Sequence, residues 1–338
     1  MNGFWELLTR PALDALAARA PVGVREIVEI GSEGGRNTRH LLDWCSSRGA
    51  RLHVIEPEPV YDPETLARDF PDSFVFHHAT SLEILPKLGR IDAALIDGDH
   101  NWYTVYHELV ELEKVNGAEF PLVLLHDMAW PFARRDLYYA PARIPGEYRH
   151  AYQRGGVRRG EEALAAYDGL AHELNKALAE GGPRNGVRTA VEDFMAQSAL
   201  ALRLEIVPVD FGLGLLATQS LLERAPALRA LFDQLSSPAF EHRLLEYLEG
   251  RRIDDIIDLQ GTCARSRLEL EGVVEDLGRH HAELERHQVE VKRLREMLDA
   301  STLEVRDLRM RLRSLPWWSL WRIGAPLLRA VRRWGPRA

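Results

Sequence analysis

The stretch that decides the fold lies near the N-terminus and reads Val28-Glu29-Ile30-Gly31-Ser32-Glu33-Gly34-Gly35-Arg36-Asn37-Thr38. It has the form of a buried strand, a glycine turn and the start of a helix. A second apolar run over residues 52–55 ends in another acid, Glu56. Glycines let a backbone approach a bound cofactor closely, and an acid at the tip of the second strand can accept hydrogen bonds from ribose hydroxyls. The pattern therefore predicts a nucleoside site.

Two classes of nucleoside cofactor suit such a turn. A dinucleotide site requires the spacing G-x-G-x-x-G, whereas this turn reads Gly31-x-x-Gly34-Gly35. The two acids and the turn resemble motif I and its follow-on acid in class I S-adenosylmethionine (SAM) dependent methyltransferases. SAM carries an ammonium and a sulfonium, so Glu29 suits it and would repel a pyrophosphate. A plain α/β turn with Glu29 buried and paired is the alternative interpretation.

The resemblance also implies which residues contact the cofactor. It places Glu29 near the amino acid end of SAM, Glu56 on the ribose, and Thr80 or Ser81 beside the adenine. The full set of expected SAM contacts is Glu29, Gly31, Ser32, Gly34, Gly35, Asn37, Thr38, Glu56, Thr80, Ser81 and Asp97.

Alternating strands and helices predict an α/β, Rossmann-like fold with a mostly parallel sheet. Ligands then bind at the carboxyl ends of the strands. An amphipathic helix over residues 4–18 comes first, and a β-hairpin over residues 203–217 closes the sheet. The expected strands span residues 27–30, 52–55, 74–77, 93–96 and 122–125, and the expected helices span residues 38–45, 63–70, 81–85 and 103–114.

The chain divides into four predicted segments. A methyltransferase domain covers residues 1–220, and residues 128–190 within it form an insertion expected to act as a lid or substrate loop. A helical linker over residues 221–252, a coiled coil over residues 253–315 and a basic aromatic tail over residues 316–338 follow.

The coiled coil is predicted from apolar residues that recur every seven positions. They are Ile256, Cys263, Leu270, Leu277, Leu284, Val291, Leu298, Val305 and Leu312. The companion positions are mostly polar: Val274, His281, Gln288, Arg295, Thr302 and Arg309. We expect this seam to join copies of the chain into a homo-oligomer. A long solvated helix lying on the catalytic domain is the alternative.

The last segment combines tryptophan and arginine and contains no acid. Tryptophan favours membrane interfaces, and arginine pairs with anionic headgroups. The run over residues 319–327 resembles a tail found on bacterial proteins of cell-surface polysaccharide assembly. We expect the tail to bind an anionic membrane surface; a core-packing helix beside a partner chain is the alternative. The residues concerned include Trp317, Trp318, Trp321, Trp334, Arg322, Arg329, Arg332, Arg333 and Arg337.

Composition narrows the function further. The net charge of −8 over 338 residues argues against a general nucleic-acid binder. The only cysteines, Cys45 and Cys263, lack metal-site spacing, and a disulfide framework is not expected. The N-terminus lacks the layout of a signal peptide, and no apolar stretch is long enough to span a bilayer. These features predict a cytoplasmic protein, with the tail at the inner face of the cell membrane.

Residues that carry the chemistry follow the fourth and fifth strands. The run Asp97-Gly98-Asp99-His100 resembles the D-G-x-H segment of a methyltransferase subfamily that includes macrolide-sugar O-methyltransferases and cephalosporin-hydroxylase-like proteins. That resemblance implies that Asp97 helps to hold a divalent metal and that His100 is the general base. Asp127 matches the acid after strand five, while His126 replaces a second acid. Oxygen ligands suit Mg²⁺, and an imidazole ligand favours Mn²⁺ or iron.

We therefore expect a SAM-dependent O-methyltransferase that acts on a sugar hydroxyl in cell-surface polysaccharide or glycolipid biosynthesis. His100 would remove the hydroxyl proton, and a metal on Asp97, His126 and Asp127 would hold adjacent hydroxyls. A structural, hydrogen-bonded role for His100 is the alternative. Two other functions remain open: a non-catalytic scaffold in a polysaccharide assembly complex, and an iron-dependent hydroxylase with a facial metal site.

Overall fold

The computed structural model describes residues 5–19, 23–166 and 169–314. The chain divides into two units, residues 1–249 and residues 250–338. The predicted tail over residues 316–338 lies outside the described residues.

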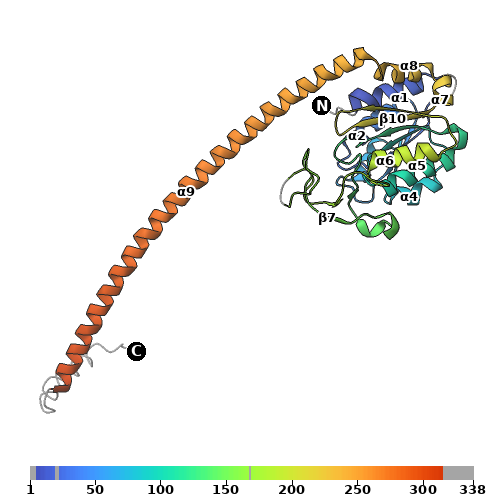
Figure 1. Cartoon of the computed structure of the whole chain (residues 1–338). Helices are drawn as coiled ribbons and strands as arrows, with labels where there is room; N and C mark the ends of the chain where they lie inside the picture. Colours follow the sequence, from blue (N-terminus) through green and yellow to red (C-terminus); the bar gives the residue numbers. More distant parts are fainter. Residues whose placement is uncertain (1–4, 20–22, 167–168, 315–338) are drawn as a thin grey trace, which may run out of the picture. The chain divides into compact units, whose positions relative to one another are not determined.

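A seven-stranded sheet forms the centre of the first unit (Figure 1). Its order is β3 (Phe74–His77), β2 (Arg51–Ile55), β1 (Glu26–Ile30), β4 (Ala93–Ile96), β5 (Leu122–Leu125), β10 (Leu213–Thr218) and β9 (Leu202–Val207). The first five strands are parallel, whereas β10 is antiparallel to both β5 and β9. The prediction of a mostly parallel Rossmann-like sheet with a closing hairpin is confirmed.

Helices cover both faces of the sheet, because its central strands are apolar on both sides. In β5, Leu122 and Leu124 face one core and Val123 and Leu125 face the other. Figure 1 shows α1 and α8 on one side of the sheet, with α5 and α6 on the other. The helices of this unit are η1 (Trp5–Thr9, a π-helix), α1 (Arg10–Ala17), α2 (Arg36–Ser46), α3 (Pro63–Asp69), α4 (Ser81–Ile84), α5 (Trp102–Asn116), α6 (Val187–Gln197), α7 (Gln219–Arg224) and α8 (Pro226–Leu235).

Short 3₁₀ turns supplement these helices. They are η2 (Leu85–Lys87), η3 (Gly117–Glu119), η4 (Pro141–Arg143) and η5 (Gly146–Tyr148). Capping residues explain where α3 and α5 begin. Asp62 accepts a hydrogen bond from the Glu64 amide at the start of α3, and Asn101 accepts one from the Thr104 amide at the start of α5.

The segment expected to be a helical linker packs onto the core of the first unit. It contains most of α7, all of α8 and the start of α9 (Pro238–Ser314). Leu221, Leu222, Leu228 and Phe232 are buried in the same core as α1 and α2. The apolar residues of this segment therefore extend the domain that precedes them.

The insertion over residues 128–190 contains a small antiparallel sheet of its own. Its order is β6 (Leu137–Tyr138), β8 (Asn175–Ala177) and β7 (Tyr152–Arg154). Two fully buried cations hold its loops together. Arg135 donates to the carbonyl oxygens of Ala177, Leu178 and Glu162, while Lys176 donates to those of Gly155, Ala171 and Leu174. Burial lowers the pKa of Lys176 to about 8.

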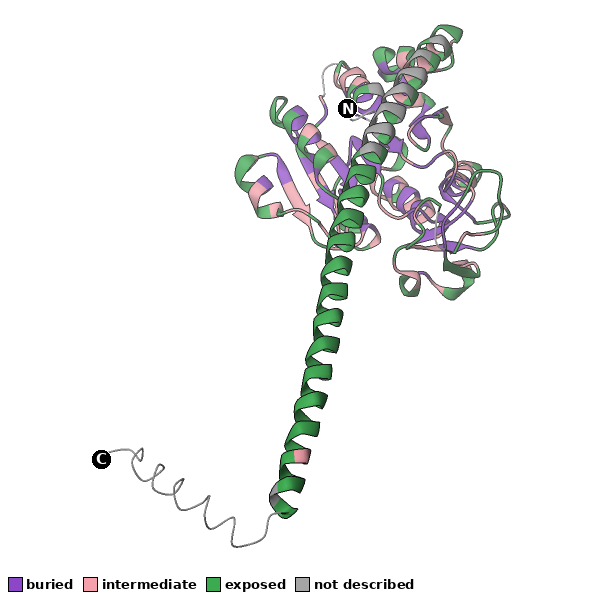
Figure 2. Cartoon of the chain, turned by 90° about the vertical axis from the view of Figure 1, so that its left-hand side faces the viewer, coloured by how far each residue is buried: buried purple, intermediate pink, exposed green. Residues whose placement is uncertain are grey.

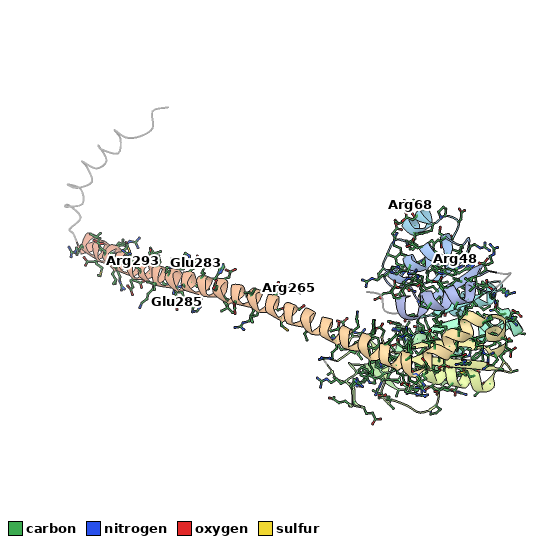
Figure 3. All side chains as sticks on the ribbon, turned by 90° about the horizontal axis from the view of Figure 1, so that it is seen from above. Arg48, Arg68, Arg265, Glu283, Glu285 and Arg293 are labelled. Atoms are coloured by element: carbon green, nitrogen blue, oxygen red, sulfur yellow. The ribbon has the colours of Figure 1, made fainter. Side chains whose placement is uncertain are left out.

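The second unit contains the greater part of α9, a helix of 77 residues. Figure 2 shows by its colours that the described residues of α9 are exposed almost throughout. Charged side chains such as Arg265, Glu283, Glu285 and Arg293 project from it (Figure 3). In the described part of the chain, no helix combines the length and the apolarity needed to cross a membrane.

Candidate active site

The carboxyl ends of the parallel strands meet at one edge of the sheet, and the predicted site residues meet there with them. The backbone hydrogen bonds between neighbouring strands continue for one residue beyond the strand ends. Gly31 donates its amide to Ile55, Asp97 donates to Ile30, and His126 donates to Ile96. The register thus places the glycine turn, Asp97 and His126 on neighbouring chain segments.

The three glycines of the turn have different surroundings. A Cβ on Gly31 would lie 2.2 Å from the carbonyl oxygen of Asp97, and its φ is +82°. Gly35 also has positive φ and lies against the ring of Tyr61. Around Gly34, by contrast, there is open space within 4 Å of the Cβ position. Packing therefore accounts for Gly31 and Gly35, and Gly34 leaves room for a ligand to approach the backbone.

The carboxylate of Glu56 holds the glycine turn. Its Oε2 accepts hydrogen bonds from the amides of Ser32, at 2.9 Å, and Glu33, at 3.2 Å. Its Oε1 accepts a hydrogen bond from the amide of Glu58. Each carboxylate oxygen has more than one lone pair, so the expected ribose contact is compatible with these bonds and stays a prediction.

Glu29 is buried at the end of β1. Its Oε1 accepts a hydrogen bond of 2.8 Å from Nδ2 of Asn37, and Thr38 lies beside it on α2. Burial raises the pKa of Glu29 to about 7, although its two neighbours on α2 partly offset the rise. A cation bound beside this carboxyl would favour its ionised form.

Thr80 and Ser81, the expected adenine contacts, begin the short helix α4. Thr80 forms a capping box with Glu83, whose Oε2 lies 3.0 Å from the Thr80 amide. Ser81 is buried next to Glu108 of α5. Burial raises the pKa of Glu108 to about 8. Sequence reasoning missed Glu108, since an acid within a helix gives no sign of burial.

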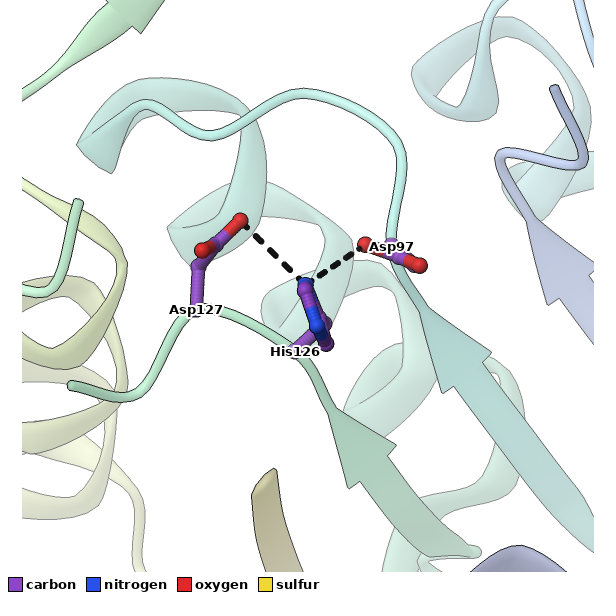
Figure 4. Close-up of side chains that lie close together, drawn as sticks. All are labelled: Asp97, His126 and Asp127. Atoms are coloured by element: carbon purple, nitrogen blue, oxygen red, sulfur yellow. Dashed lines mark ion pairs between the residues drawn. The ribbon is translucent and has the colours of Figure 1, made fainter. Parts of the chain in front are cut away.

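Two histidines and two aspartates lie together after β4 and β5. Nδ1 of His100 lies 2.6 Å from Oδ2 of Asp127. Nδ1 of His126 lies 3.1 Å from Oδ1 of Asp97 and 3.4 Å from the same Oδ2 of Asp127 (Figure 4). One ligand atom from each of Asp97, His126 and Asp127 lies within 4.8 Å of the others. The structure therefore brings the predicted base and metal ligands together.

Opposing effects set the charges in this cluster. Burial favours neutral imidazole, but the hydrogen bond and charge of Asp127 outweigh it, so the pKa of His100 is raised. The same balance, with hydrogen bonds to Asp127 and Asp97, raises the pKa of His126 to about 11. Burial alone would raise the pKa of Asp127, yet the two histidines hold it well below its usual range.

The insertion fixes the position of His100. Leu137 donates its amide to the carbonyl oxygen of His100. Two rings from the insertion lie beside its imidazole, Phe132 with a centroid distance of 5.9 Å and Tyr139 with one of 5.8 Å. Sequence reasoning placed both residues in the insertion but gave them no role, because only the tertiary fold brings them to His100.

Asp136 joins the insertion to the segment that carries His100. Its Oδ1 accepts hydrogen bonds of 2.7 Å from the amides of Trp102 and Gly186, and its Oδ2 accepts one from the hydroxyl of Tyr138. A buried carboxylate with three donors is well satisfied. The contact anchors the insertion to the N-terminus of α5, two residues from His100.

Comparisons with known proteins found one family model and several similar solved structures. A family model described as "Methyltransferase domain" matches residues 28–128. No curated protein matches the chain. Solved structures similar to it include a Podospora anserina methyltransferase bound to S-adenosylhomocysteine, at 13% identity over 62% of this chain and 77% of that one, with a TM-score of 0.36. Another is a Burkholderia thailandensis 1,6-didemethyltoxoflavin N1-methyltransferase, at 15% identity over 64% and 79%, with a TM-score of 0.34.

The family match describes residues 28–128, from within β1 to the residues just after β5, as a methyltransferase domain. The match over these residues supports the prediction of a methyltransferase.

Proposed function

We propose that the chain transfers the methyl group of SAM to a hydroxyl of a sugar, within a cell-surface polysaccharide or a glycolipid. The observation that carries the proposal is the contact of 2.6 Å between Oδ2 of Asp127 and Nδ1 of His100. An alcohol is a poor nucleophile until its proton is removed, so a hydroxyl acceptor needs a base at this place.

His100 suits the role of that base. The carboxylate of Asp127 accepts the Nδ1 proton of the imidazole, which orients the ring and leaves Nε2 to take a proton from the acceptor. Phe132 and Tyr139 flank the ring, and Tyr139 is half exposed. An aromatic wall beside a polar catalytic group is common in sites for small organic ligands.

SAM supplies an electrophilic methyl group on a sulfonium when it is bound. The open space at Gly34 and the buried carboxyl of Glu29 fit a cationic nucleoside over the glycine turn. Glu29 would face the amino acid end and Glu56 the ribose, while Thr80 and Ser81 would border the adenine. Holding the acceptor in line with the methyl group supplies much of the rate in such a transfer.

A divalent metal, Mg²⁺ or Mn²⁺, belongs to the same proposal. Asp97, His126 and Asp127 would hold it, since their ligand atoms lie within 4.8 Å of one another. Two carboxylates and one imidazole form a donor set that divalent cations accept. The metal would lower the pKa of a bound hydroxyl.

The proposed location is the cytoplasmic face of an anionic membrane, where a lipid-linked sugar acceptor would be available. This part rests on the tryptophans and arginines of residues 316–338. A basic residue near such a surface contributes about 1 kcal/mol of binding free energy.

The test begins with calorimetry of the full chain with SAM, with and without Mg²⁺ or Mn²⁺. Transfer of a labelled methyl group is then measured to nucleotide sugars, lipid-linked sugars and, as a contrast, amines. We expect methylation of a sugar hydroxyl, and loss of turnover but not of SAM binding in His100→Ala. Transfer to an amine alone, or full turnover in His100→Ala, would contradict the proposal.

A further inference from the structure

In the part of α9 that belongs to the second unit, an apolar residue recurs at every seventh position. We call this row of residues the seam. These residues are exposed, with fractions between 46% and 69%. Exposed apolar rows of this length usually mark an interaction surface. The seam contains Leu270, Leu277, Leu284, Val291, Leu298 and Val305.

The residues three positions after each seam residue complete the surface. Among these, Val273, Leu294 and Leu308 are apolar and exposed. The expected companions four positions after the seam include only one apolar residue, Val274. We therefore assign the seam to heptad position a and the later series to position d. The d series is Val273, His280, His287, Leu294, Ser301 and Leu308.

We propose that this surface pairs with α9 of a second copy of the chain, in a parallel, in-register, two-stranded coiled coil. Charge on the flanks of the seam carries the choice of direction. The preceding flank, position g, is mainly acidic: Glu269, Asp276, Glu283, Glu290, Met297 and Glu304. The following flank, position e, contains Arg295 and Arg309 and no acid.

A parallel pair brings each g residue opposite the e residue five positions later in the other copy. Glu290 then faces Arg295 of the second copy, and Glu304 faces Arg309. Like charges do not meet in this arrangement. An antiparallel pair would instead oppose g to g and e to e, so acids would face acids along the helix. Charge complementarity thus favours the parallel direction.

Polar residues within the seam fix the register. In register, His280, His287 and Ser301 each face the same residue of the second copy. A shift by one heptad would place His287 or Ser301 against Leu294, and would bury a polar side chain against an apolar one. Polar seam residues lower stability but specify alignment in this way.

The native residue Cys263 makes it possible to test the direction and register of the two helices. Cys263 lies seven residues before Leu270, at position a, and is exposed in the single chain. A parallel, in-register pair places the two Cys263 side chains opposite each other, whereas an antiparallel pair separates them along the helix. The other cysteine, Cys45, is fully buried in the first unit.

The experiment uses the full chain, first in sedimentation equilibrium and then with the oxidant diamide. Diamide takes two electrons and two protons from two thiols, so that one disulfide forms. We expect a dimer by mass and a covalent dimer on a non-reducing gel, which dithiothreitol reverses. Cys263→Ser should abolish the cross-link and keep the dimer, and Cys45→Ser should change neither. A monomer, a trimer, or a dimer that diamide does not cross-link would overturn the proposal.

Paired variants test the seam itself. Leu284→Asp places a charge at position a, and we expect the dimer to dissociate at least about tenfold more readily. Val289→Asp is the matched control, because Val289 is exposed and apolar but lies off the seam. If both variants weaken the dimer equally, the seam is wrongly assigned.

Discussion

One carboxylate oxygen, Oδ2 of Asp127, lies 2.6 Å from Nδ1 of His100 and 3.4 Å from Nδ1 of His126. The same atom therefore orients the proposed base and belongs to the candidate metal cluster. Asp127 has positive φ, at +57°, in the left-handed region that aspartate adopts more readily than most other non-glycine residues. The shared oxygen explains why proton removal and metal binding should respond together to changes at Asp127.

Asp127→Asn tests the pairing with His100. The amide keeps the shape of the side chain but removes its charge, so the imidazole loses its orienting partner. We expect kcat to fall by about 100-fold or more, with the SAM dissociation constant nearly unchanged. His100→Ala should cost about as much, and the double variant little more, since the two act as one unit. Additive losses would show that they act separately.

The pH dependence of kcat provides a second test. A base must be neutral to accept a proton, so activity falls below the pKa of His100. Because Asp127 raises that pKa, Asp127→Asn should move the acid limb of the profile to lower pH. The profile of kcat between pH 5 and 9 measures this shift. An unmoved or raised acid limb would contradict His100 as the base.

A larger side chain at Gly34 should weaken SAM binding and leave the stability of the fold unchanged. The space around its Cβ position is open, so Gly34→Leu should leave the melting temperature within about 2 °C of the wild type. We expect the SAM dissociation constant to rise by about tenfold or more, as calorimetry would measure. In Gly31→Ala, by contrast, the clash with Asp97 should destabilise the fold by more than about 1 kcal/mol. Unchanged SAM binding in Gly34→Leu would exclude contact there.

SAM affinity should depend on the ionisation of Glu29. Burial raises the pKa of this carboxyl to about 7, so it is largely neutral below that pH. A cationic ligand favours the carboxylate, and binding should therefore tighten as the pH rises from 6 to 8. Calorimetry in two buffers of different ionisation enthalpy would detect the released proton. Glu29→Gln should bind more weakly and lose this dependence; a wild-type affinity that is constant with pH would rule the contact out.

Glu108 should make the fold less stable at higher pH. Burial raises the pKa of Glu108 from its ordinary value of 4.5 to about 8 in the folded chain, so the folded state holds the proton more tightly than the unfolded state does. Between these values the free energy of unfolding should fall by about 1.4 kcal/mol for each pH unit. Denaturant unfolding of the wild type and Glu108→Gln at pH 5 and pH 8 measures the difference. We expect Glu108→Gln to gain stability relative to the wild type at pH 8.

Local patterns in the sequence were enough to predict the central sheet. Runs such as residues 93–96 and 122–125 are apolar on both faces, and parallel strands between two helical layers require that pattern. The glycine turn, Asp97 and Asp127 follow strands directly, so their meeting at one edge followed from the fold class. The heptad repeat likewise predicted the long helix α9 from spacing alone.

Only the tertiary structure decided the surroundings of these residues. It placed Phe132 and Tyr139 beside His100 and gave Asp127 two imidazole partners. It also buried Glu108 and packed residues 221–235 on the core. Periodicity records which face of an element is apolar, and it carries no information about which distant segment covers that face. The sequence therefore determined the sheet and the residues at its edge, while long-range packing set their pairings and charges.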